Sequence, residues 1–483
     1  MDQMRLSVDE MRELGHAAVD LIAERTHDLG NRPVARRWTR EELEKALREP
    51  VPTDGRDPLR VLDRVAADIL PACAATDHPR FFAYVPSPGN FVAAVADFLA
   101  SGANVFAGHW LAGAGAAQVE LIVLDWLRDL LGLPASAGGI LTSGGTQATL
   151  VAIHAARMDR LQAGNPGARI YVTRHTHAAI VRGLAYLGFI PDQVHAVPTT
   201  DDQVMDAAAL QAAIDADHAA GAVPLCVVAT AGTTSTGAID PLNAIADVCH
   251  RSGVWFHVDA AYGGAAVLST RARPLLDGIG RADSIAMDPH KWWFQPYEAG
   301  CTLVRDAEKL RRAYTLDAVY LTEARAADDP VNFYDYGPQL TRSFRALKIW
   351  MTLQTFGLNT VREAVEHGIT LAEQTESLIR ANPRWDVVTP ARLGVVTFRP
   401  HLPGLDDDTV HRITRQIAQD TLTDGHAMVF TTDLGSGPVL RMCTIHPETT
   451  TQDIGSTLDT LDRLLAHVGG SRPPGSQETR PRR

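Results

Sequence analysis

The sequence has few cysteines and places them far apart. Its 483 residues include five, Cys73, Cys226, Cys249, Cys301 and Cys443, and no pair has the spacing of metal ligands. A disulfide-stapled scaffold and a cysteine metal centre are therefore excluded, and no metal is expected. Reduced thiols in a cytoplasmic protein are predicted instead.

Basic charge and long apolar runs are also lacking. Lys and Arg number 45 against 57 Asp and Glu, a net charge of −12, which argues against nucleic acid or an anionic membrane surface as the main partner. No run reaches the roughly twenty apolar residues of a membrane span. Residues 1–22 lack the basic-then-apolar layout of a signal peptide. They predict an amphipathic helix, with Ser7 and Glu10 spaced as a capping box.

Short β-rich runs alternate with helical patterns in the middle of the chain. One helix is punctuated by Pro241 in its first turn and Gly253 after its end. Strand–helix alternation predicts an α/β fold with a mostly parallel sheet and helices on both faces. The predicted strands are 138–143, 168–173, 224–230, 254–261, 284–288 and 301–306.

The length exceeds what one hydrophobic core fills, so more than one domain is expected. Residues 1–85 are mainly helical and too thin to stand alone, which predicts packing on a partner subunit. A large domain is expected at 86–350 and a small α+β domain at 351–468. The Pro-, Gly- and Arg-rich tail, 469–483, is predicted to be disordered.

The stretch "SIAMDPHKWW" (284–293) places Lys291 at the end of an apolar run. An ammonium group without water loses proton affinity, and the neutral amine is a nucleophile. The alternative is an ordinary lysine whose stem lies on the surface while its charge stays in water.

Other polar groups are expected near Lys291, because ligand sites of open α/β sheets lie beyond the carboxyl ends of the strands. In "TSGGTQAT" (142–149), Gly145 and Thr146 open a helix whose free N–H groups suit an anion such as phosphate. In "HVDAAYGG" (257–264), Asp259 ends an apolar strand. His175 and His177 follow another strand, and "ATAGTTSTGAID" (229–240) carries hydroxyl groups at a fourth. Taken singly, these features also fit a turn, a helix cap or a structural ion pair.

Together they supply what pyridoxal 5′-phosphate needs. Its phosphate group suits a helix N-terminus, its aldehyde suits a lysine, and its ring nitrogen suits a carboxylate that keeps it protonated.

The chain resembles the group II pyridoxal-phosphate decarboxylases, the family of aromatic-L-amino-acid decarboxylase. The resemblance runs from "HPRFFAYVPSPGNF" (78–91), through "TSGGTQAT", "HVDAAYGG" and "DPHKWW", to "RSFRALKIW" (342–350). It implies an aspartate-aminotransferase-like fold with a mostly parallel seven-stranded sheet. It also implies decarboxylation of an L-amino acid, aromatic by first choice, to the amine and CO2.

The resemblance assigns roles residue by residue. Lys291 matches the lysine that bonds to the cofactor, Asp259 the partner of the ring nitrogen, and His177 the imidazole that stacks on the ring. Thr234 resembles the hydroxyl that supports His177. The remaining matches are Gly145 and Thr146 at the phosphate, Ala261 under the ring, His290 before the lysine, and Tyr84, Pro86 and Ser87 in the substrate pocket.

Two features depart from the family. Asp288 stands where an asparagine is common near the phosphate, and because its charge would repel that group we expect it to turn to backbone or solvent. The substrate pocket has Thr76, Val85 and Gly108 where the aromatic decarboxylases tend to have bulky aromatics, which predicts a wider pocket or another side chain.

The loop before "RSFRALK" leaves the product open. Counting back from Phe344 puts Phe333 at the position of the family's proton-donating tyrosine, whereas a one-residue shift puts Tyr334 there. With Phe333 the product would be an aldehyde, and with Tyr334, which we favour, an amine.

Other activities remain open from the sequence. They are a lyase or aldolase of the same fold, a glutamate or diaminobutyrate decarboxylase, and a scaffold without activity. A homodimer with shared active sites is expected, with 81–87 and 106–110 at its interface.

Overall fold

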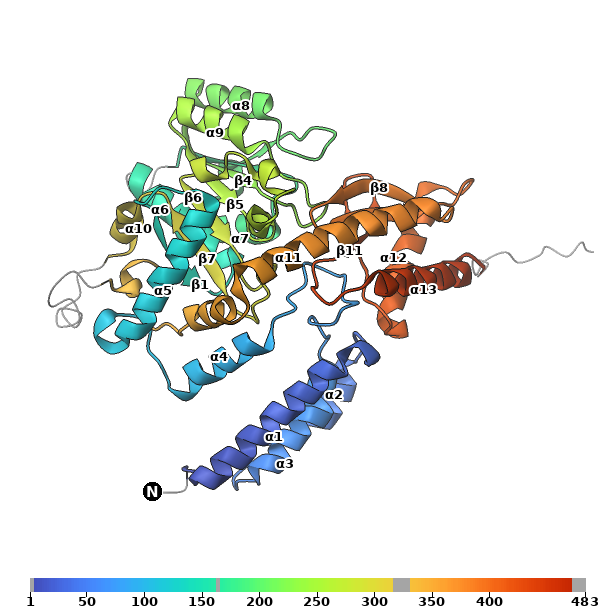
Figure 1. Cartoon of the computed structure of the whole chain (residues 1–483). Coiled ribbons are helices and arrows are strands. Elements are labelled where there is room, and N and C mark those ends of the chain that lie inside the picture. The colour runs from blue at the N-terminus through green and yellow to red at the C-terminus, as the bar shows by residue number, and fades with distance from the viewer. Residues whose placement is uncertain (1–3, 162–165, 316–330, 471–483) are drawn as a thin grey trace, which may run out of the picture.

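The computed structural model describes residues 4–161, 166–315 and 331–470. The predicted disordered tail lies outside the described residues from 471 on, as do residues 329 and 330 of the loop before "RSFRALK". A large sheet and its helices form the main body, a small sheet lies at the far end of a long helix, and the N-terminal helices project from both (Figure 1).

The central sheet has seven strands in the order β1-β7-β6-β5-β4-β2-β3, and only β7 runs antiparallel to its neighbours. The strand interiors are buried and rich in Val, Ile and Leu, as expected for a sheet covered on both faces. The fold prediction is therefore confirmed. The strands are β1 (Gly138–Thr142), β2 (Ala168–Thr173), β3 (Val194–Val197), β4 (Val223–Thr230), β5 (Trp255–Asp259), β6 (Ser284–Met287) and β7 (Gly300–Val304).

Helices connect and cover these strands (Figure 1). The punctuation predicted for one of them is off by one residue: Pro241 is the N-cap of α9 rather than part of its first turn. Gly253 ends α9 in the left-handed conformation, with φ +64°. The helices are α4 (Phe91–Gly102), α5 (Trp110–Leu131), α6 (Gly145–Arg160), α7 (Ala178–Tyr186), α8 (Ala207–Ala219), α9 (Leu242–Ser252) and α10 (Ala307–Tyr314).

Helix α5 is long and apolar enough to cross a membrane by length and composition alone. It packs instead against β1 and the rest of the core, with Val123 and Leu127 buried. Its Glu120 is fully buried and lies 2.6 Å from the guanidinium of Arg342. Arg342 also donates hydrogen bonds to the carbonyls of Ala107 and Leu141. This ion pair joins α5, β1 and the segment that leads into the long helix beginning at Ala346.

The small domain is built on a four-stranded antiparallel sheet in the order β10-β11-β9-β8. Helix α11 (Ala346–Ala381) leads to it from the main body, so the boundary expected at residue 350 lies inside this helix. The remaining elements are β8 (Trp385–Arg392), β9 (Val395–Pro400), α12 (Asp407–Asp424), β10 (Phe430–Asp433), β11 (Pro438–Cys443) and α13 (Thr451–Gly470).

The N-terminal segment contains α1 (Val8–His27), α2 (Arg40–Leu47) and α3 (Pro58–Arg64), which extend away from the body (Figure 1). The capping box predicted at Ser7 and Glu10 is confirmed: Glu10 N–H donates to Ser7 Oγ over 3.2 Å, and Ser7 N–H donates to Glu10 Oε2 over 2.7 Å. No residue of α1 is buried in this chain.

Candidate active site

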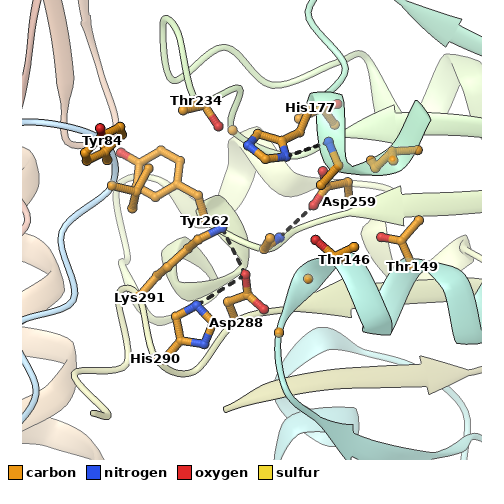
Figure 2. Close-up of a pocket in the computed structure, with 18 of the residues that line it drawn as sticks. Tyr84, Thr146, Thr149, His177, Thr234, Asp259, Tyr262, Asp288, His290 and Lys291 are labelled. Atoms are coloured by element: carbon orange, nitrogen blue, oxygen red, sulfur yellow. Dashed lines mark hydrogen bonds and ion pairs between the residues drawn. The ribbon is translucent and has the colours of Figure 1, made fainter. Parts of the chain in front are cut away.

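The carboxyl ends of β1, β2, β4, β5 and β6 meet at one edge of the large sheet, where a cavity of about 390 Å³ opens. Several segments reach this cavity (Figure 2). Among them are the glycine-rich turn before α6, the turn with His175 and His177 before α7, the end of β5, and the segment that carries Lys291. Nine predicted site residues line it: Tyr84, Gly145, Thr146, His177, Thr234, Asp259, Ala261, His290 and Lys291.

Lys291 points into the cavity between two carboxylates. Its Nζ lies 2.9 Å from Asp288 Oδ2, and Asp259 contributes a second negative charge. Burial opposes the ammonium charge, but the two carboxylates outweigh it and raise the pKa of Lys291 above its usual value. The predicted loss of proton affinity by desolvation is therefore wrong for this arrangement.

Asp288 does not turn to solvent, and that expectation is also wrong. Its carboxylate is 3% exposed and faces Lys291 and the start of α6 (Figure 2). Oδ2 carries the ion pair with Lys291 and lies 3.7 Å from His290 Nε2. Oδ1 is buried and has no hydrogen-bond partner among the residues that the structure describes.

Asp259 lies at the end of β5, where its Oδ1 accepts a hydrogen bond from Ala261 N–H over 3.1 Å. Burial raises the pKa of this carboxyl group, although Lys291 and the Ala261 hydrogen bond act against the shift. A buried carboxylate of this kind is stabilised by a cationic partner. A protonated pyridine nitrogen fits that requirement.

The start of α6 forms an anion cradle, by which we mean the backbone of Gly144, Gly145 and Thr146; the preceding Ser143 N–H already donates to Gln147 Oε1 over 2.9 Å. The helix begins at Gly145 without a side-chain cap, so its first N–H groups face the cavity. A Cβ atom at Gly145 would lie 2.9 Å from Asp288 Oδ2 and 3.3 Å from Ala261 Cβ, so only glycine fits here. The cradle suits a phosphate group.

His177 lines the cavity and also caps α7, because its Nδ1 accepts a hydrogen bond from Ala179 N–H over 3.3 Å. The helix cap considered from the sequence is thus present, whereas stacking of His177 on the cofactor ring stays a prediction. Burial and the charge of Lys291 lower the pKa of His177, so the ring is neutral near pH 7. Thr234 lies nearby, but in the part of the chain that the structure describes its hydroxyl is not hydrogen bonded to His177 (Figure 2).

The predicted substrate segment divides into two parts. Tyr84 and Val85 line the cavity, and the Tyr84 ring meets Phe430 edge to face with centroids 5.0 Å apart. Pro86 and Ser87 are buried and are not among the described residues that line it, so their role at the substrate stays a prediction. Ser87 Oγ donates to the carbonyls of His290 and Gln295, so it supports the lysine segment from behind.

The three pocket residues that differ from the aromatic decarboxylases do not all lie at the cavity. Of Thr76, Val85 and Gly108, only Val85 lines the cavity. The interface expected at 81–87 is corrected in part, because Phe81 and Phe82 pack within this chain against the small domain.

Several lining residues were not proposed from the sequence. Tyr262 stacks on Trp292 with ring centroids 5.2 Å apart, and its hydroxyl accepts a hydrogen bond from Gly394 N–H of the small domain. Both aromatics belong to the motifs that carry Asp259 and Lys291, which was the available signal. Thr149 and Glu298 also line the cavity. Thr149 is the last residue of "TSGGTQAT" (142–149), whereas no sequence pattern marked Glu298.

Arg441 of β11 joins the small domain to the cavity. Its guanidinium is 4% exposed and donates hydrogen bonds to the carbonyls of Thr234 and Tyr84, on two segments of the cavity wall. Burial lowers the pKa of Arg441. Arg441 is a positioning residue, because it acts through the two segments that it holds.

Two residues could occupy the position of the family's proton-donating tyrosine, Phe333 and Tyr334. Neither is among the described residues that line the cavity of its own chain. Phe333 is 1% exposed, and its ring lies under the Arg342 guanidinium, 4.9 Å from Cζ to centroid. Tyr334 is 3% exposed, its N–H donates to the Gly108 carbonyl over 2.9 Å, and its ring lies 6.1 Å from that of His109.

Comparison with known proteins identifies the family. The model of the pyridoxal-dependent decarboxylase conserved domain matches residues 41–401. The chain belongs to this family. It is a pyridoxal-phosphate-dependent amino-acid decarboxylase, and the cavity described above has the groups to hold that cofactor.

Individual members of the decarboxylase family are similar over nearly the whole chain. An aromatic-L-amino-acid decarboxylase of Bacillus atrophaeus is 40% identical over 475 residues, covering 98% of this chain and 99% of the relative. A phenylacetaldehyde synthase of Arabidopsis thaliana is 32% identical, covering 90% and 92%. The crystal structure of Oryza sativa TDC with PLP and tryptamine has a TM-score of 0.90 and 30% identity, covering 96% of this chain and 99% of that one.

Replacement of Lys291 tests the site directly. Lys291→Ala removes the amine that bonds to the cofactor, so we expect loss of the visible absorption band of the bound cofactor. Turnover should fall by more than about a thousandfold, as for other residues that form covalent bonds in catalysis. Lys309→Ala is the matched control, because Lys309 pairs with Asp159 at the surface. A Lys291→Ala protein with an unchanged band would contradict the assignment.

Proposed function

We propose that the protein decarboxylates an aromatic L-amino acid to the corresponding amine and CO2. The observation that carries the proposal is the placement of Lys291 between two carboxylates, beside an uncapped helix start and a neutral imidazole. The Bacillus atrophaeus relative, named for aromatic amino acids, supports the choice of substrate.

The lining of the cavity favours an apolar side chain on the substrate. Among the described residues that line it, Lys291 is the only Lys or Arg, and we have placed it at the cofactor. A glutamate side chain would need a further cation there. Tyr84, Val85 and Ile180 offer aromatic and aliphatic surface instead, which suits an aromatic ring.

The residues divide the work as follows. When bound, pyridoxal phosphate supplies an electron sink for the electron pair left on Cα as CO2 departs. Asp259 would hold the proton on the ring nitrogen, and the N–H groups of Gly145 and Thr146 would hold the phosphate. His177, being neutral, provides a flat surface beside the ring without adding charge near the substrate carboxylate.

The product depends on whether a proton reaches Cα before oxygen does. If it does, the amine forms. If not, oxygen accepts the electrons and, with water, the products are aldehyde, ammonia, CO2 and hydrogen peroxide. We favour the amine, because Phe333 is fixed in the core under Arg342 whereas Tyr334 lies beside Gly108 and His109, in the segment expected at the subunit interface.

The substrate proposal is tested with a panel of L-amino acids. The protein is incubated with aromatic amino acids, glutamate and diaminobutyrate, each labelled in the carboxyl group, and CO2, amines and aldehydes are measured by mass spectrometry. We expect labelled CO2 and an amine from an aromatic amino acid. Labelled CO2 from glutamate or diaminobutyrate alone would contradict the proposal, and cleavage at Cα–Cβ would indicate a lyase or aldolase.

The two loop residues are separated by paired variants. Tyr334→Phe should lower amine formation by about 100-fold to 10,000-fold and raise the aldehyde share, because a phenyl ring cannot donate a proton. Phe333→Tyr, the matched control, should leave the amine-to-aldehyde ratio unchanged. If Phe333→Tyr instead converts aldehyde into amine, the enzyme is an aldehyde synthase and our assignment is wrong.

We also propose a homodimer with shared active sites. Helix α1 buries none of its residues in this chain. Apolar side chains on α1, α3 and α4 are exposed, namely Val8, Met11, Val19, Ile22, Val61, Phe91, Phe98 and Leu99. Because Tyr334 does not line its own cavity, a role in proton donation requires the cavity of a second copy.

Light scattering and mixing experiments test the dimer. Val19→Asp with Ile22→Asp should yield monomers with little activity, whereas Leu405→Asp, at an equally exposed site on another face, should stay dimeric. Mixing Lys291→Ala with Tyr334→Phe protein under conditions of subunit exchange should restore amine formation. A fully active monomer would overturn the proposal.

The cytoplasmic location, and the lack of a nucleic-acid or membrane partner, remain proposals. They are supported by the net charge of −12 and by five free cysteines, four of them buried. Fractionation of cells that express the protein would check the location.

A further inference from the structure

Asp288 combines three properties that the decarboxylation chemistry does not explain. It is 3% exposed, it neighbours the anion cradle, and one of its oxygens, Oδ1, lacks a hydrogen-bond partner within residues 4–161, 166–315 and 331–470. A buried carboxylate oxygen without a partner is costly, and such an atom in a binding site points to a group that satisfies it.

The geometry places the anion of the cofactor against this carboxylate. A Cβ atom at Gly145 would lie 2.9 Å from Oδ2, and one at Gly144 would lie 3.9 Å from Oδ1. A phosphate held by the N–H groups at the start of α6 therefore lies beside Asp288. Two negative groups at such a distance repel strongly when water is excluded.

Lys291 offsets the Asp288 charge only while its Nζ is an ammonium paired with Oδ2. With the cofactor bound, Nζ would be bonded to carbon and would keep at most one N–H, so the free ammonium that pairs with Oδ2 would no longer be available. Neither neighbouring imidazole offers Asp288 a further charge, because burial lowers the pKa of both His177 and His290. The titratable groups that face Asp288 are Lys291, His290, Asp259, His177 and Cys301.

We propose that Asp288 takes up a proton when the cofactor is loaded, and that its neutral carboxyl group then donates a hydrogen bond to the phosphate. The proton comes from solvent, an O–H bond forms on Asp288, and no bond in the protein breaks. The repulsion is thereby removed, and the unpartnered oxygen gains a partner. This role rests on pyridoxal phosphate as the cofactor and not on which amino acid is the substrate.

Proton counting by calorimetry tests the role. Cofactor binding is measured in buffers with different ionisation enthalpies, for wild type and for Asp288→Asn, which has the same shape but no titratable group. We expect wild type to take up about one proton more than the variant. By linkage, one extra proton makes the Kd of wild type depend more strongly on pH. The ratio of the wild-type Kd to the Asp288→Asn Kd should rise about tenfold for each pH unit. At alkaline pH the variant should bind the cofactor more tightly.

Lys309→Ala serves as the matched control. Lys309 forms an ion pair with Asp159 outside the cavity, so this variant should keep the wild-type proton number and affinity. Because Asp259→Asn also removes the partner of the ring-nitrogen proton, its proton number should fall together with its affinity for the cofactor. Equal proton numbers for wild type and Asp288→Asn would overturn the proposal.

Infrared difference spectroscopy on wild type keeps the test decisive if Asp288→Asn does not fold or load. Addition of the cofactor should produce the C=O band of a protonated carboxyl group. A spectrum without that band would overturn the proposal. Because the readouts are proton number, affinity and a vibrational band, failure here is distinguishable from failure of the proposed activity.

Discussion

Burial of both faces of the seven-stranded sheet confines the charged groups of the site to the ends of its strands. Asp259 is the last residue of β5, Asp288 follows β6, and Lys291 lies between the two carboxylates. In this dry setting each charge is tolerable only because an opposite charge lies close by. The cofactor brings a phosphate and a ring nitrogen into the same space, so its binding rearranges a set of charges that already depend on one another.

The architecture could be predicted from the sequence because buried strands have a clear composition. The runs that became β4 and β5 consist mainly of apolar residues, and every residue from Pro224 to Asp259 within these two strands is buried. Strands β3 and β10 were not named in advance, since each has only four residues and is half-exposed at a sheet edge. Such strands are held by their neighbours rather than by their own composition.

The site could be predicted where the chemistry of a residue and its local motif are enough to assign it, as with Lys291, Asp259 and the glycines at α6. It was not predictable where the role depends on a partner far along the chain. Ser87 bonds to the carbonyl of His290, 203 residues away, and no local pattern marks that contact. The proton affinity of Lys291 likewise depends on which carboxylates fold against it, so desolvation alone gave the wrong sign.

Arg441 has a consequence for how the two domains can vary. It extends from the small sheet and holds the carbonyls of Thr234 and Tyr84, while the Tyr262 hydroxyl is bonded to Gly394. The cavity wall is thus fastened at separate points to a domain that contributes none of the charged groups around the lysine. A small domain transplanted from another decarboxylase would have to match this chain's backbone at those points, so the two domains are constrained to diverge together rather than independently.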